Sequence, residues 1–178
     1  MNNLKLIIIS FLLLFCGVLF FLQQESWIII NFSTPKSFIK KNNVSIQPKE
    51  TPIWIFANGT FKKETAEIIF SNDHAQTIKM LINSWLTTLE EENITDKQIT
   101  VQSVILSPSG QDAFICLTET PLNKQTSTHT KLMVIESMLK TLKDAKLGIT
   151  NIRLLVHHQP MQDPHLNFDI SWPVTGFQ

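Results

Sequence analysis

The chain has little cysteine, little glycine and no excess of charge, and each shortage excludes a class of protein. Its two cysteines, Cys16 and Cys116, cannot provide a framework of disulfides, so an apolar core must stabilise the fold. Its five glycines form no glycine-rich loop of the kind that cradles phosphate groups. Fifteen basic residues balance fifteen acidic ones, which leaves no basic surface for nucleic acid. We therefore expect no nucleic-acid partner.

Motifs of catalysis are also missing. The sequence contains no Gly-x-Ser-x-Gly motif of the kind that exposes a nucleophilic serine. Cys116 has neither a local histidine nor a helix N-terminus beside it, so a small buried apolar residue is its simplest interpretation. We expect no catalytic residues, no cofactor and no small-molecule substrate.

The longest apolar run, from Leu6 to Leu22, predicts a membrane anchor within residues 1–30. At about 1.5 Å per residue it is just long enough to cross a bilayer core. The run ends in bulky residues instead of the small ones that precede a cleavage site. Cys16 also allows a lipid-attachment interpretation, although the bulky Phe15 stands where such signals need a small residue. A short N-terminal tail usually stays inside, so we expect the rest of the chain outside the cytoplasm.

A polar segment, residues 31–51, separates this anchor from the folded part. It contains Pro35, Pro48 and the cluster Lys40–Asn43, and it shows no sustained hydrophobic period. The remaining residues, 52–178, are enough for one domain with a single core. The sequence thus predicts an anchor, a linker and one domain.

Hydrophobic periodicity in that domain predicts alternating strands and helices. Asn58-Gly59 stands between two runs rich in apolar residues, which is typical of a hairpin. A helical stripe that includes Trp85 follows Asp73, a residue suited to cap a helix, and a second stripe runs through residues 130–149. Between the two helices, the segments ITVQSVILS and AFICLTE predict two strands with a short turn at Pro108–Asp112.

This order of elements predicts an α+β fold. Because the turn between the two middle strands is too short for a crossover, the sheet must be mixed or antiparallel, with about four to five strands and two helices on one face. The second helix has one polar side that we expect to face water. It carries Lys131, Glu136, Lys140, Lys143 and Asp144.

The end of the chain gathers imidazoles and carboxylates. A strand over NIRLLVHHQ would place His157 and His158 on opposite faces, so only one of them could join a common metal ion. Asp163, His165 and Asp169 would supply the other ligands, in a set that suits zinc. Surface histidines that form hydrogen bonds are the simpler interpretation. The alternation in HLNFDISWPVTGF then predicts a half-buried edge strand at the C-terminus.

The succession of ITVQSVILSPSGQDAFICLTE, a polar loop, IESMLKTLKDA and NIRLLVHH resembles the GerMN domain family of bacterial sporulation and germination proteins and envelope lipoproteins. The resemblance extends from Pro52 to Pro160, and Thr141-Leu142 matches a Thr-Leu pair of the family's second helix. It implies an extracytoplasmic βαββαβ domain, similar to the ring-building folds of sporulation channel proteins, that works through protein contacts without catalytic residues.

Together these features predict a single-pass protein of the bacterial inner membrane with a periplasmic domain. We expect that domain to bind a protein partner or a second copy of itself, and to be non-enzymatic. A metal-dependent envelope hydrolase that uses His157 or His158 with Asp163, His165 and Asp169 is the alternative. A purely structural spacer is a third possibility.

Overall fold

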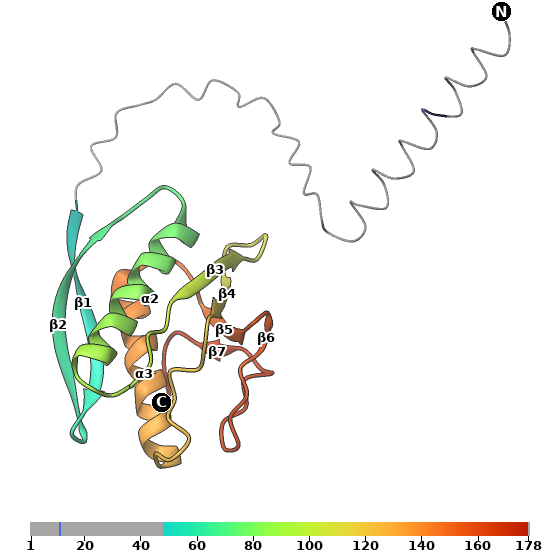
Figure 1. Cartoon of the computed structure of the whole chain (residues 1–178). Helices are drawn as coiled ribbons and strands as arrows, with labels where there is room; N and C mark the ends of the chain where they lie inside the picture. Colours follow the sequence, from blue (N-terminus) through green and yellow to red (C-terminus); the bar gives the residue numbers. More distant parts are fainter. Residues whose placement is uncertain (1–10, 12–47, 178) are drawn as a thin grey trace, which may run out of the picture. The chain divides into compact units, whose positions relative to one another are not determined.

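Two helices lie between two sheets in the part of the chain that the structure describes (Figure 1). The structure is a computed structural model, and it describes Phe11 and residues 48–177. Along the chain the elements are β1 (Pro48–Ala57), β2 (Thr60–Ile69), α2 (His74–Glu91), β3 (Val101–Leu106), β4 (Asp112–Leu117), α3 (Thr128–Ala145), β5 (Asn151–Val156), β6 (Gln159–Pro160) and β7 (Trp172–Pro173). The predicted α+β class and the two helices are confirmed.

The strands form two sheets, so the prediction of a single sheet is wrong, but the larger sheet has five strands, is mixed and has both helices on one face, as predicted. β1 and β2 make an antiparallel hairpin by themselves, while β3, β4, β5 and β6 form a second sheet in which β7 also pairs with β5. Only β4 and β5 run parallel. β1 cannot accept another strand at its second edge, because Pro48 and Pro52 have no N–H there and Trp54 N–H donates to Thr141 Oγ1 on α3 at 2.8 Å.

The turn chemistry of the hairpin and the helix start agree with the sequence. Asn58 and Gly59 both have positive φ, of 54° and 78°, as a two-residue hairpin turn requires. Asp73 caps α2 by accepting the N–H of Ala75 at 2.9 Å. These features were predictable because they depend only on neighbouring residues.

Part of the polar side of α3 is buried, so the prediction that Lys131 and Glu136 face water is wrong. Lys131 is 1% exposed and Glu136 is 8% exposed, because the rest of the domain covers α3 on more than one side. Glu136 Oε2 accepts the N–H of Phe177 at 2.9 Å, and a side chain at Gly176 would collide with the Glu136 carboxylate. The C-terminal segment is thus fastened to α3. Lys140, Lys143 and Asp144 remain outside the core.

The predicted membrane anchor lies outside the described residues apart from Phe11, and so does Cys16 with its lipid-attachment alternative. Within Phe11 and residues 48–177, no helix has both the length and the apolar character needed to span a bilayer.

The strand predicted over NIRLLVHHQ is interrupted by a turn. β5 ends at Val156, which pairs with Gln159 of β6, and His157 and His158 form the two-residue connection. Both have positive φ, of 50° and 63°, so they do not alternate across a strand. Histidine tolerates the left-handed region better than most residues that have a Cβ, which is how this pair can replace the usual Asn-Gly.

A better turn sequence should therefore stabilise the domain. We expect the double variant His157→Asn, His158→Gly to be more stable by about 1 kcal/mol, because glycine has no Cβ strain at positive φ and Asn-Gly is the preferred pair for a two-residue hairpin turn. Urea unfolding followed by circular dichroism measures the gain. His165→Asn, at an exposed position without positive φ, should leave stability unchanged. A destabilised double variant would show that the imidazoles make contacts that outweigh the strain.

The C-terminal edge strand, which the sequence predicts to end at Pro173, is wrong except at Trp172–Pro173. Asp163 Oδ1 accepts the N–H groups of His165 and Leu166, and Asn167 Oδ1 accepts that of Asp169. Such local bonds from side chain to backbone compete with a strand ladder. The segment between β6 and β7 is therefore a loop, although its buried Phe168 still packs into the core and stacks on Trp172.

Candidate functional site

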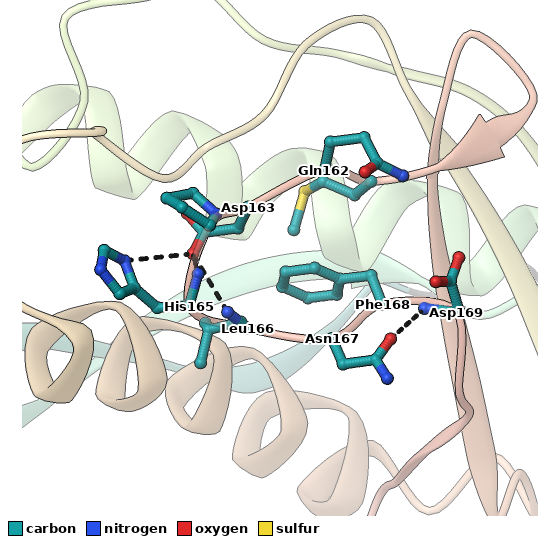
Figure 2. Close-up of a pocket in the computed structure, with 9 residues that line it drawn as sticks. Gln162, Asp163, His165, Leu166, Asn167, Phe168 and Asp169 are labelled. Carbon is teal, nitrogen blue, oxygen red and sulfur yellow. Dashed lines mark hydrogen bonds and ion pairs between the residues drawn. The ribbon is translucent and has the colours of Figure 1, made fainter.

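The loop between β6 and β7 surrounds a shallow pocket that includes three of the predicted site residues. The pocket has a volume of about 290 Å³ and is lined by residues 161–169, among them Asp163, His165 and Asp169 (Figure 2). His157 and His158 are exposed in the turn between β5 and β6 and are not among its lining residues. The structure thus gathers part of the predicted set in one loop.

Asp163 forms a buried ion pair. Its Oδ2 lies 2.6 Å from Lys131 Nζ on α3, and the two side chains are 4% and 0% exposed. Its Oδ1 accepts the backbone N–H groups of His165 at 2.9 Å and of Leu166 at 3.2 Å. Both carboxylate oxygens are therefore occupied within the protein, which makes Asp163 the residue that fastens this loop to α3.

The electrostatics of Asp163 agree with that role. Burial by itself would raise the pKa of this carboxyl group, since it disfavours the charged form. The hydrogen bond from Lys131, the two backbone N–H groups and the attraction of the lysine charge outweigh burial and hold the pKa of Asp163 below its ordinary value. Asp163 is thus ionised at neutral pH and committed to Lys131.

This lowered pKa predicts a loss of stability in acid. Because the folded pKa lies below the unfolded value of about 3.9, the contribution is complete above that value and disappears as the pH falls through the folded pKa. We expect the stability difference between the wild type and Asp163→Asn to shrink below about pH 4. Urea unfolding across this range measures it, and Glu119→Gln, which breaks the exposed pair with Lys97, is the control. A difference that stays constant down to pH 2 would contradict the assignment.

The other predicted ligands do not converge with Asp163. His165 Nδ1 lies 3.9 Å from Asp163 Oδ1, beyond hydrogen-bond distance, and its side chain is half exposed. Asp169 lies at the opposite end of the pocket, where its N–H donates to Asn167 (Figure 2). In the described ranges, no group of three or more histidine, cysteine or acidic side chains is placed to hold a metal ion. The metal-hydrolase interpretation stays a prediction, which metal analysis of the purified protein tests.

A second candidate surface, on the larger sheet, was not predicted from the sequence. The face of the larger sheet that points away from the helices carries a cross-strand row of Ile105, Phe114 and Arg153. The Arg153 guanidinium lies 6.0 Å from the centre of the Phe114 ring and donates to Ser171 Oγ at 3.0 Å. Ile105 is 62% exposed, and neither helix covers this side of the sheet (Figure 1). Strand alternation locates such a row, but only the structure shows which face the helices leave open.

Cys116, on the neighbouring row of this face, is 2% exposed. It lies between Ser103 and Leu155 across the strands, and its Sγ is 3.3 Å from Gln102 Oε1 and from the backbone nitrogen of His158. The prediction of a small buried residue is confirmed.

Comparisons with known proteins find a likeness in structure but not in sequence. No family profile matches the chain, and no curated protein matches it. A crystal structure of a protein from Clostridium perfringens assigned as a lipoprotein aligns with a TM-score of 0.47 at 15% identity, over 72% of this chain and 89% of that one. The tandem GerMN domains of the sporulation protein GerM from Bacillus subtilis align with a TM-score of 0.46 at 16% identity, over 70% of this chain and 46% of that one.

The GerMN resemblance of the sequence thus recurs in the structural comparison. Both likenesses concern the fold alone, and neither assigns a function or a site to this chain.

Proposed function

We propose that the chain is a membrane-anchored, extracytoplasmic protein-interaction domain of the bacterial envelope, without enzymatic activity. The observation that carries this proposal is the open face of the larger sheet, where Ile105 is 62% exposed beside Phe114. Phe114 and Arg153, which lie beside this exposed isoleucine, belong to residue types that are enriched in protein interfaces. The apolar run at residues 6–22 and the polar segment 31–51 supply the anchor and the tether in this proposal.

The chemistry of the β6–β7 loop supports the same proposal. Its one buried carboxylate is neutralised by Lys131 and by two backbone N–H groups, so it is not poised to act as a general base. The loop has a structural role in this proposal, since the ion pair between Asp163 and Lys131 fixes the C-terminal part of the domain to α3.

Crosslinking in native membranes followed by mass spectrometry tests the proposal. We expect lysines of the domain to crosslink to another polypeptide, and Ile105→Glu to reduce that product while Ser109→Glu in the neighbouring turn does not. Because Ile105 is mostly exposed, its substitution should change stability by no more than about 0.5 kcal/mol. A domain that protease protection places in the cytoplasm, or that crosslinks to nothing, would contradict the proposal.

A further inference from the structure

β2 has a free edge along its whole length. In the described part of the chain it pairs with β1 only, and it is the outermost strand of the hairpin (Figure 1). Trp54 donates its N–H to α3 instead of to β2, so Trp54 and its partner Lys63 are a pair whose backbone groups point away from the hairpin ladder. By alternation, the residues of β2 whose backbone N–H and C=O groups point to the free edge, here called the outward residues, are Phe61, Lys63, Thr65, Glu67 and Ile69.

The corresponding edge of the other sheet is partly closed. On β3, Val101 N–H donates to Asn83 of α2 at 2.9 Å, and the carbonyl of Gln102 accepts from Lys79 at 3.0 Å. Within residues 48–177, no side chain or backbone group forms a hydrogen bond with the outward backbone groups of β2. A row of this kind is a template for a further strand.

The outward residues of β2 complement their own sequence when it is read in the opposite direction. In an antiparallel pair centred on Thr65, Lys63 of one copy stands opposite Glu67 of the other, and Phe61 stands opposite Ile69. Each strand then brings all five outward residues into register, and two threonines meet at the centre. Opposite charges, apolar pairs and Thr-Thr pairs in facing positions all stabilise a sheet.

Neighbouring registers lack this match. A pairing centred on Lys63 would place two lysines opposite each other, and one centred on Glu67 would oppose two glutamates, which is destabilising. Charges on an edge strand usually prevent pairing. On β2 the lysine and the glutamate are spaced so that one arrangement satisfies them.

We propose that two copies of the chain join through their β2 strands, antiparallel about a twofold axis at Thr65, so that two hairpins become one four-stranded sheet. This inference rests on the proposed interaction role and names the partner on this edge as a second copy. The contact is isologous, so it closes as a dimer and leaves the Ile105 face of both copies open.

Disulfide trapping tests the geometry in the full chain. Directly opposed residues in a hydrogen-bonded antiparallel pair have Cα atoms about 5.5 Å apart, within the range of a disulfide. We expect Thr65→Cys, in a Cys16→Ser background, to give a disulfide-linked dimer on mild oxidation in membranes. Ser109→Cys, at an exposed turn in the same background, is the matched control. Dimer formation by Thr65→Cys no greater than by Ser109→Cys would overturn the proposal.

Charge reversal tests the register. Glu67→Lys places lysines opposite each other twice in the symmetric pair, and we expect it to weaken dimerisation about tenfold. The double variant Lys63→Glu, Glu67→Lys restores opposite charges and should restore the dimer. The amount of disulfide-linked dimer formed through Thr65→Cys, measured at a series of expression levels, compares the chain without charge changes, Glu67→Lys and the double variant. A double variant that stays as weak as Glu67→Lys would exclude this register.

The crosslinking and disulfide-trapping results distinguish a failure of self-pairing through β2 from a failure of the proposed protein-interaction function. Membrane crosslinks to a different protein, with no dimer through Thr65→Cys, would leave the proposed function intact and overturn self-pairing. If that different protein is itself trapped by Thr65→Cys, the edge accepts a foreign strand and the second-copy assignment falls. Dimer formation with rescue by the double reversal supports the proposal.

Discussion

Lys131→Met should destabilise the domain by about 3 kcal/mol, because it leaves the buried Asp163 carboxylate without its cation. The side chains of this pair are 0% and 4% exposed, so water cannot replace the lost lysine without opening the loop. Two backbone N–H groups still bind Oδ1, which is why we expect the lower end of the range for a broken buried pair. With a typical urea dependence of about 1–3 kcal/mol per molar, the unfolding midpoint should fall by about 1–3 M.

A double variant separates the cost of an unpaired charge from the loss of packing. In Lys131→Met, Asp163→Asn the asparagine oxygen can still accept the N–H groups of His165 and Leu166, but neither side chain is charged. We expect this variant to regain most of the lost stability, since removing both charges of a buried pair is often nearly neutral. Asp163→Asn alone should resemble Lys131→Met, because it leaves the lysine charge unpaired. A double variant less stable than either single one would mean that shape, not charge, dominates here.

The burial of Lys131 also shows where reasoning from the sequence stops. A helical stripe identifies one buried side, and the stripes of α2 and α3 were recognised from the spacing of their apolar residues. α3, however, is enclosed on more than one side, and the segments that enclose it are distant in the chain. A lysine on the second buried side looks like any solvated lysine until its partner, 32 residues away, is placed beside it.

The split into two sheets has the same origin. Local signals located the hairpin at Asn58-Gly59 and the turn at Gly110, because the positive φ of each depends on a few neighbouring residues. The second edge of β1 is closed in part by Pro48 and Pro52, which the sequence shows, and in part by the bond from Trp54 N–H to Thr141 Oγ1, which joins residues 87 positions apart and appears in no local pattern. The histidine turn was missed for a different reason, since His-His is an uncommon choice for two left-handed residues.

Trp85→Ala should be the most damaging single change in the apolar core, with an expected loss of about 3–5 kcal/mol. Trp85 on α2 is fully buried, and its Nε1 donates to Ser137 Oγ of α3 at 3.1 Å. The substitution leaves a cavity between the two helices and removes the hydrogen bond that joins them. Because a domain of this size is stabilised by about 5–15 kcal/mol in total, the variant should unfold at markedly lower urea concentration, as measured by circular dichroism.

Two milder variants divide that loss between packing and hydrogen bonding. Trp85→Phe retains most of the apolar volume but cannot donate, and Ser137→Ala removes the acceptor together with the bond from Ser137 Oγ to the Val134 carbonyl. If the indole bond contributes about 1 kcal/mol, the two effects should be smaller in combination than their sum by that amount. Additive effects would show that Trp85 acts through packing alone. The two helices would then be held together by the shape of the core, and their polar link would serve only to satisfy a buried N–H group.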